Sequence, residues 1–541
     1  MTKKYNWINN ILGWVIGIFA SAVYIITAEP TASWWDCGEY IATANKLLVG
    51  HPPGAPTFQL LGRLFSMFAG GDVTKVAVCI NSMSAICSGL TIMFLFWTMT
   101  MLGRKLVANM EGGMTPGRMA ALFGSALVGS LTYTFTDTFW FSAVEGEVYA
   151  MSSFFTALVF WCILKWDFEY DNPKGNVNPN RWIVLIAYLI GLSIGVHLLN
   201  LLTIPAVVLI VYFKLSKKAT VWGVVQTIAL ASVVAAVFFP TVAMILIWLF
   251  ISLPLLVICY RKGTFSSLAE WGILFSLIGS FILLGLILYG IIPMIVNLAG
   301  KFEIFFVNSF GLPFNSGTII YFLLIAGLIA WGLWYGYKKG KGNLVAGVYC
   351  FLFLLIGYST FFVLTIRSNA NPTIDENNPE DAVALLAYLN REQYGDTPFL
   401  TGRTYDSRPT SYKNGTPVYV RDDAAKKYVI SDKRENSVPY YDDSQKRFMP
   451  RMYDHERKEN YINWLYANDP VKAAKLIRKT RIPDYQENIK FMHTYQFYYM
   501  YWRYFLWNFS GRQGDVQGTG GELEGNWITG INAFDQIFLG K

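Results

Sequence analysis

Two acidic residues lie three positions apart just after the first long apolar run, in the segment WWDCGEY. If that segment is helical, Asp36 and Glu39 lie on one face, with their Cβ atoms about 6 Å apart. A positioned carboxylate can take a proton from a hydroxyl group, and a second acid can orient that group or bind a metal. With Trp35 before them and the rigid segment HPPG after them, they indicate a catalytic loop. The alternative interpretation is a solvated loop.

A second group of polar residues extends this pattern. His51 opens the HPP segment, where the prolines hold the backbone extended. Glu145 and Glu147 precede the fourth apolar run, where a helix N-terminus favours anions. Charges at a membrane boundary usually face a bundle interior or a cavity, which favours a functional role. Acids are also common at helix starts, so a local role stays open, and Asp137 is a weaker candidate.

Other candidates depend on their positions. His197 lies between two apolar runs, where a histidine is more often a packing residue than an active one. Arg367 directly follows the last apolar run, where it can hold a lipid phosphate by paired hydrogen bonds or anchor the interface. Arg403 and Tyr405 are speculative candidates.

The composition separates two regions. The chain has 541 residues, of which 54% are hydrophobic and 15% charged, whereas soluble domains average about 25% charged residues. Only 13 of the 36 acidic residues precede residue 366. This predicts a polytopic membrane domain at 1–365 and a soluble domain at 366–541. Six cysteines without a CxxC spacing favour neither a disulfide framework nor a zinc site.

Apolar runs of about 20 residues predict the membrane spans. We expect about eleven helices, with one break at Pro240 and another at 195–197. The predicted helices are 8–28, 75–102, 118–139, 146–166, 182–196, 198–214, 220–239, 241–260, 268–295, 317–337 and 344–365.

Basic residues gather in every second loop, which is the positive-inside pattern and not a nucleic-acid signal. The pattern places the N-terminus in the cytoplasm. It places loops 29–74 and 140–149, the loop near 296–316 and the domain 366–541 on the far side. The first apolar run could be a signal peptide, but its length favours an uncleaved helix. The basic clusters are Lys3/Lys4, Arg104/Lys105/Arg118, Lys165/Lys174/Arg181, Lys214/Lys217/Lys218, Arg261/Lys262 and Lys338/Lys339/Lys341.

The C-terminal region predicts an α/β-type domain. Residues 382–390 have the spacing of an amphipathic helix, and 400–404 and 417–421 indicate short strands. The segment near 487–509 is rich in tyrosine, tryptophan and phenylalanine. Such rings sit at the headgroup level of a bilayer, so we expect a membrane-surface helix there.

The motifs WWDCGEY, HPPGAP, WFSAVEGEVYAMS, IRSNANPTIDENNPEDA, LNREQYGD and YMYWRYFLWNFSGRQGD occur across almost the whole chain. Together they resemble a family of bacterial multi-pass proteins of formerly unknown function, common in Bacteroidetes. That family is similar to the eukaryotic transmembrane O-mannosyltransferase of plexin-type IPT domains and to the GT-C glycosyltransferases. Family members often continue beyond the glycine-rich stretch, which leaves open a truncated, split or shortened form.

The resemblance implies an enzyme that takes a sugar from a polyprenyl-phosphate carrier on the extracytoplasmic side of the bacterial inner membrane. Asp36 matches the acid of the first outer loop, with Glu39 as its companion, and Glu145 and Glu147 match a second acidic site. No metal ligands are assigned, and a divalent metal is left open. The candidates for donor or acceptor binding are Trp35, His51, Glu145, Glu147, His197 and Arg367.

The expected function is therefore an inverting membrane hexosyltransferase, with mannose among the candidate sugars and a protein or glycan hydroxyl as acceptor. Membrane lipids are expected partners, and nucleic acid is not. One alternative is a lipid-linked sugar flippase or transporter. It is disfavoured because the acids concentrate in outer loops, the spans are almost purely apolar, and no internal repeat is evident. A non-catalytic scaffold for envelope assembly is the other alternative.

Overall fold

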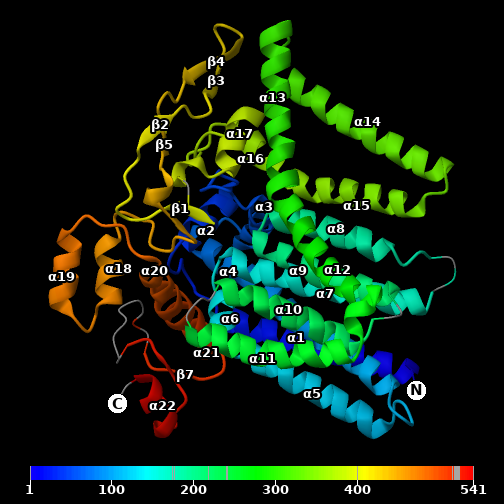
Figure 1. Cartoon of the computed structure of the whole chain (residues 1–541). Helices are drawn as coiled ribbons and strands as arrows, with labels where there is room; N and C mark the ends of the chain where they lie inside the picture. The colour runs from blue at the N-terminus through cyan, green and yellow to red at the C-terminus, as the bar shows by residue number, and fades with distance from the viewer. Residues whose placement is uncertain are drawn as a thin grey trace. The chain divides into compact units, whose positions relative to one another are not determined.

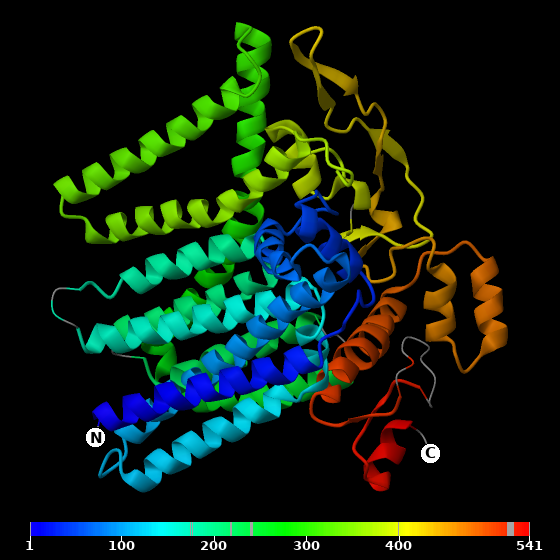
Figure 2. The same ribbon diagram turned by 180° about the vertical axis from the view of Figure 1, so that it is seen from behind.

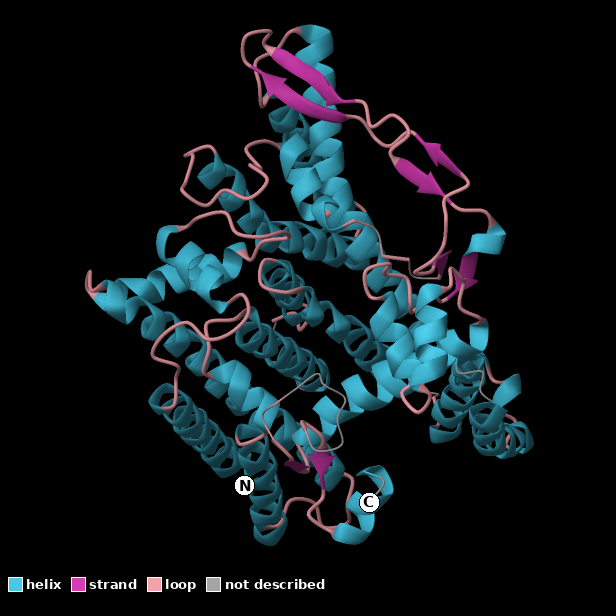
Figure 3. Cartoon of the chain, turned by 90° about the vertical axis from the view of Figure 1, so that its left-hand side faces the viewer, coloured by secondary structure: helices cyan, strands magenta, loops and turns pink. Residues whose placement is uncertain are grey.

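The computed structural model describes residues 2–173, 175, 177–216, 219–238, 242–395, 397–398, 400–514, 516 and 524–539. The chain forms two compact units. The first contains residues 1–219, 268–392 and 422–428, and the second contains 220–267, 393–421 and 429–541. Helices dominate the described residues, and the strands occur as short pairs (Figure 3).

The first unit is a bundle of long helices with short helices between them (Figures 1 and 2). Helix α1 packs against α4, α4 against α7, and α8 against α15. The helices are α1 Thr2–Ile26, α2 Cys37–Lys46, α3 Pro56–Ser66, α4 Val76–Ala108, α5 Pro116–Thr134, α6 Asp137–Ala143, α7 Val148–Asp171, α8 Arg181–Ile194, η3 Leu198–Leu202, α9 Thr203–Leu215, α12 Leu268–Gly285, η5 Leu286–Ile291, α13 Ile292–Phe310, α14 Ser316–Lys338, α15 Gly342–Tyr358, α16 Phe362–Ser368 and α17 Ala382–Leu389.

The long helices confirm an α-helical polytopic membrane protein. Seven helices among the described residues are long and apolar enough to cross a membrane, or eight if the bent pair α5 and α6 is one span. The other three predicted runs hold shorter apolar helical stretches, Arg181–Ile194, Val221–Val233 and Leu249–Arg261. The expected break at 195–197 lies between α8 and η3, whereas Pro240, Lys174, Lys217 and Lys218 lie outside the described residues.

Two predicted boundaries were wrong. The predicted helix 118–139 bends by 68° between α5 and α6, because Thr136 has an extended backbone from which α6 starts anew. The predicted loop near 296–316 is largely helical, since α13 continues to Phe310. Its buried face recurs every four residues through Ala299, Glu303 and Val307, and Glu303 accepts hydrogen bonds from the backbone at the start of α14.

The first outer loop contains helices α2 and α3. Helix α2 ends where Leu47 adopts a left-handed backbone, and α3 starts with Pro56, which suits the first turn of a helix. Ile41 of α2 and Phe58 of α3 belong to the main core of the first unit, together with α7, α8 and α17. The loop is therefore anchored by buried apolar residues and can hold polar groups at fixed positions.

The second unit combines short helices with small antiparallel pairs. Strand β1 pairs with β6, β2 with β5, and β7 with β8. The predicted amphipathic helix is α17 of the first unit, and the two predicted strands correspond to β1 and β3. The remaining bounds are α10 Val221–Phe238, α11 Val242–Arg261, β1 Thr401–Arg403, β2 Ser411–Lys413, β3 Val418–Asp422, β4 Lys427–Asp432, β5 Val438–Tyr440, β6 Lys446–Phe448, α18 Lys458–Leu465, α19 Pro470–Arg478, α20 Tyr485–Phe491, η9 Met492–Trp502, α21 Arg503–Trp507, β7 Gly511–Arg512, β8 Trp527–Ile528 and α22 Asn532–Leu539.

Candidate active site

The start of α2 positions the two acids of the WWDCGEY segment. Trp35 has a left-handed backbone, with φ of 63°, and the residue is 89% exposed. Asp36 is the N-cap residue of α2, but its side chain does not cap the helix. Glu39 lies in the first helical turn, where the helix dipole favours a carboxylate. The predicted spacing therefore puts both acids at the same end of one helix.

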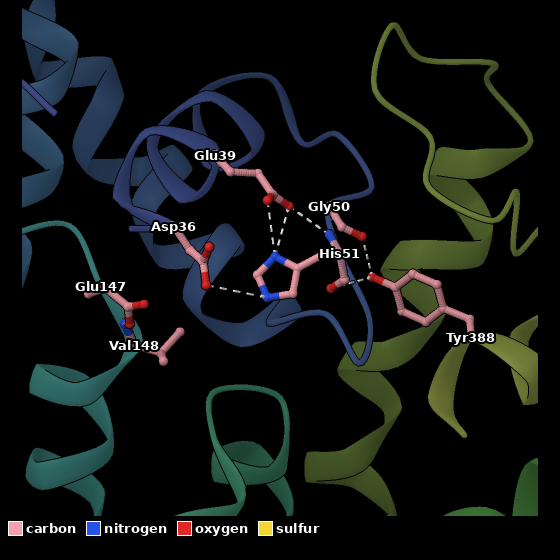
Figure 4. A network of polar contacts seen from close by, with 7 residues as sticks. All are labelled: Asp36, Glu39, Gly50, His51, Glu147, Val148 and Tyr388. Atoms are coloured by element: carbon pink, nitrogen blue, oxygen red, sulfur yellow. Dashed lines mark hydrogen bonds and ion pairs between the residues drawn. The ribbon is translucent and has the colours of Figure 1, made fainter. Parts of the chain in front are cut away.

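His51 connects the two acids (Figure 4). Its backbone N–H donates to Glu39 Oε1 at 2.6 Å, and its Nδ1 lies 3.0 Å and 3.1 Å from the two oxygens of that carboxylate. On the other edge of the ring, Nε2 lies 3.9 Å from Asp36 Oδ2. The imidazole thus contacts a carboxylate with each of its nitrogens.

The contacts of His51 distinguish the two acids, Glu39 and Asp36. The hydrogen bond to Glu39 raises the pKa of His51, and the same bond lowers the pKa of Glu39. Together they favour an imidazolium–carboxylate pair. The side chain of Asp36 is 57% exposed, and its contact with the ring is longer. Asp36 is therefore the more exposed of the two carboxylates.

The turn that holds His51 is fixed by a helix far along the chain. Tyr388 of α17 donates from its hydroxyl to the carbonyl oxygens of Gly50 at 2.6 Å and His51 at 3.2 Å. Gly54 has φ of 72°, and a Cβ there would lie 2.7 Å from the Tyr388 hydroxyl. A Cβ at Gly50 would lie 2.5 Å from Glu39 Oε1. These two glycines allow the backbone to approach its partners closely.

The segment before α17 supports the same turn. Val49 donates to the carbonyl of Ile374 at 3.0 Å and accepts from the N–H of Glu376 at 3.1 Å. Residues 374–388 therefore hold the HPPG turn although more than 300 residues separate them. Sequence reasoning missed Tyr388. It occupies a buried position of the predicted helix 382–390, and no local signal identifies its partner.

The second outer loop lies close to the first. Ser33 donates to Glu145 at 2.5 Å, and Glu147 accepts from the backbone N–H of Val148 at the start of α7. Burial raises the pKa of Glu145 and raises that of Glu147 to about 7, with the charge of Asp36 adding to the latter effect. The structure therefore brings both predicted acidic loops together, and Glu147 can carry a proton near neutral pH.

Two predicted binding residues have other contacts. Arg367 donates to the carbonyl oxygens of Leu47 at 2.6 Å and Lys46 at 3.3 Å, so its guanidinium braces the C-terminal end of α2. His197 precedes η3 and accepts at Nδ1 from the N–H of Leu199 at 3.2 Å. Burial lowers the pKa of His197, which favours the neutral ring.

The remaining candidates have local positions. Asp137 begins α6. In the second unit, Arg403 lies in β1 opposite Lys446, and Tyr405 is buried against Tyr461. In the part of the chain that the structure describes, no group of three or more His, Cys, Asp or Glu residues is arranged to hold a metal ion. The role of a metal stays a prediction.

Comparison with known proteins places this cluster in a matched segment. Residues 36–221 match the model of the Protein O-mannosyl-transferase TMEM260 N-terminal domain, and residues 395–493 match a family of unknown function (DUF8416). No solved structure matches.

Two curated relatives align with a similar share of the chain. Protein O-mannosyl-transferase tmem260 of Dictyostelium discoideum is 27% identical over 211 residues, which cover 38% of this chain and 24% of the relative. Protein O-mannosyl-transferase TMEM260 of Mus musculus is 24% identical over 215 residues, which cover 39% of this chain and 27% of the relative. The match thus spans about a quarter of each relative. It confirms the predicted similarity to the eukaryotic transmembrane O-mannosyltransferase for the segment that carries both acidic outer loops.

Proposed function

We propose that the protein is a membrane glycosyltransferase of GT-C type that moves a mannose-type hexose from a polyprenyl-phosphate carrier to a protein or glycan hydroxyl. The proposed location is the bacterial inner membrane, with the outer loops and the C-terminal region on the extracytoplasmic face. The observation that carries the proposal is the exposed carboxylate of Asp36 beside the His51–Glu39 pair. Its position inside the segment similar to O-mannosyltransferases supports the sugar-transfer reaction.

The proposed reaction is a single inverting displacement. The acceptor hydroxyl donates its proton to Asp36 as its oxygen attacks the anomeric carbon of the donor sugar. A carbon–oxygen bond forms on one face of the sugar, and the bond from the anomeric carbon to the phosphate oxygen breaks on the other. Polyprenyl phosphate leaves with the bonding electrons, and Asp36 holds the proton. A positioned base of this kind contributes about 10²- to 10⁴-fold to the rate.

The neighbouring groups have supporting roles in this proposal. The Glu39–His51 pair sets the position of the imidazole ring beside Asp36. Glu147, with a pKa of about 7, keeps a proton on part of the molecules and can donate a hydrogen bond to a sugar hydroxyl.

The test compares Asp36→Asn with a matched control in a deletion strain of the source organism. Asp72→Asn is the control, because Asp72 is a partly exposed acid of the same outer loop that caps a short helix, and asparagine caps equally well. Glycoproteomics of envelope proteins is measured together with the membrane abundance of each variant. We expect Asp36→Asn to lose hexose-modified peptides at normal abundance, while Asp72→Asn retains them.

Unchanged envelope glycosylation with Asp36→Asn would refute the catalytic role and favour a scaffold. The donor is tested separately in membrane vesicles supplied with polyprenyl-phosphate mannose or with a nucleotide-linked mannose. Transfer from the first without conversion of the second supports the proposed carrier. Transfer from the nucleotide sugar alone contradicts it.

A further inference from the structure

A buried arginine in the second unit has no ion-pair partner in the part of the chain that the structure describes. Helix α20, the π-helical stretch η9 and α21 follow one another directly as the aromatic helix at 485–507 (Figure 1). Arg503 lies in it with only 3% of its surface exposed. Arginine is almost never fully buried unless it is paired, and among the described residues no carboxylate forms an ion pair with Arg503.

Aromatic rings lie against this guanidinium, but they do not accept hydrogen bonds from the N–H groups at its edge. Its central carbon lies 3.9 Å from the ring centre of Tyr499 and 5.0 Å from that of Trp507. Such contacts stabilise the charge through the flat face of the group. The N–H groups lie in the plane of the guanidinium, and within the described ranges the buried Nε and Nη1 have no hydrogen-bond partner. Nη2 donates a long hydrogen bond to the sulfur of Met500 at 3.9 Å.

Trp507 adds a third donor to the same cluster. It is 3% exposed, and its buried indole Nε1 has no hydrogen-bond partner among the residues that the structure describes. A second cation is near it, because the guanidinium carbon of Arg512 lies 4.3 Å from the ring centre of Trp507. Two arginines therefore lie over one tryptophan. Three buried donor nitrogens of Arg503 and Trp507 have no acceptor among the described residues.

We propose that Arg503 and Trp507, with Arg512 beside them, form a binding site for a phosphate group. The in-plane edge of an arginine matches two oxygens of a phosphate, and an indole N–H is a further donor that suits a phosphate oxygen. A phosphate also supplies the negative charge that the buried guanidinium requires, since an isolated buried charge is strongly unfavourable. The group can belong to free phosphate or to a lipid headgroup. This inference concerns binding only and is independent of the proposed sugar transfer.

The test measures binding with the purified full chain in nanodiscs. One arm titrates inorganic phosphate into neutral-lipid nanodiscs and records the melting temperature and the heat of binding. The other arm uses nanodiscs that contain phosphatidic acid. A saturable rise in melting temperature in the first arm indicates a free phosphate, and a rise in the second arm alone indicates a lipid headgroup. The absence of a rise in both arms overturns the proposal.

Three variants assign the effect to the cluster. Arg503→Met keeps the length of the side chain and removes its charge, and we expect the affinity to fall about tenfold or more. Trp507→Phe keeps an aromatic ring and removes only the N–H, so a loss of about fivefold is expected with the fold retained. Trp502→Phe is the matched control, because Trp502 is an exposed residue of the same helix. Unchanged affinity in both Arg503→Met and Trp507→Phe overturns the proposal.

Discussion

Replacing Glu39 by glutamine tests whether His51 is held as an ion pair. The amide can still accept the backbone N–H of His51, but it carries no charge to pair with the imidazolium. Hydrogen bonds to charged groups contribute about 1.5–3 kcal/mol. The side chains of His51 and Glu39 are 21% and 28% exposed, so solvent weakens the pair. We therefore expect a coupling free energy near the lower end, about 1.5 kcal/mol.

The pH dependence of this coupling has a definite sign. The pKa of His51 is raised above its ordinary value of 6.5, so its contribution is complete below pH 6.5 and is lost as the pH rises through the raised value. The pKa of Glu39 is lowered below its ordinary value of 4.5, so its contribution is present above pH 4.5 and is lost as the pH falls through the lowered value. The coupling is thus largest between pH 4.5 and 6.5 and smaller at pH 9.

A double-mutant cycle with Glu39→Gln and His51→Gln measures this coupling from unfolding in detergent at pH 6 and pH 9. The chain has only four histidines, so histidine-labelled NMR can follow the titration of His51 as well. Glu39→Gln should bring the pKa of His51 back toward its ordinary value. Asp36→Asn, the control, should have a smaller effect because that contact is longer and more exposed. A coupling below about 0.5 kcal/mol at pH 6, or a wild-type His51 that titrates at or below 6.5, would refute the ion pair.

Three further substitutions test the surroundings of the site. Tyr388→Phe should destabilise the fold by about 1 kcal/mol and slow sugar transfer, because the turn at His51 loses two hydrogen bonds; equal activity and stability would contradict this. Glu147→Gln should stabilise the protein by at most about 3 kcal/mol at pH 8 and have little effect at pH 4. The reason is that the raised pKa makes the ionised acid unfavourable as the pH rises from 4.5 through 7. Unfolding experiments at both pH values measure the change in stability, and an equal change at both would contradict the raised pKa. Arg367→Met should cost about 1–2 kcal/mol of stability, because α2 loses its brace, and leave the donor KM unchanged; a raised KM with normal stability would instead favour phosphate binding.

Local patterns in the chain were sufficient for several elements. Apolar runs predicted the long helices, because a bilayer requires about 20 apolar residues with internally satisfied backbone groups. The spacing of leucines predicted α17, and the separation of Asp36 from Glu39 placed both acids at one end of a helix. The boundaries of the predicted helix 118–139 and of the predicted loop near 296–316 were wrong because tertiary packing, and not local hydrophobicity, determines where these helices bend or end. Helix α13 continues past its most apolar part because Glu303 is buried and satisfied by the start of α14.

The partners of the site residues depended on the tertiary structure alone. Periodicity describes which face of a helix is buried, but it carries no information on which distant group meets that face. Tyr388 contacts a turn 337 residues away, and Arg367 contacts a carbonyl 320 residues away. Those contacts leave Arg367 as a brace of α2 and place His51 between two carboxylates. Local sequence patterns thus predicted the candidate reactive residues. Only the tertiary structure determined which of their side chains are accessible and which are bound by neighbouring groups.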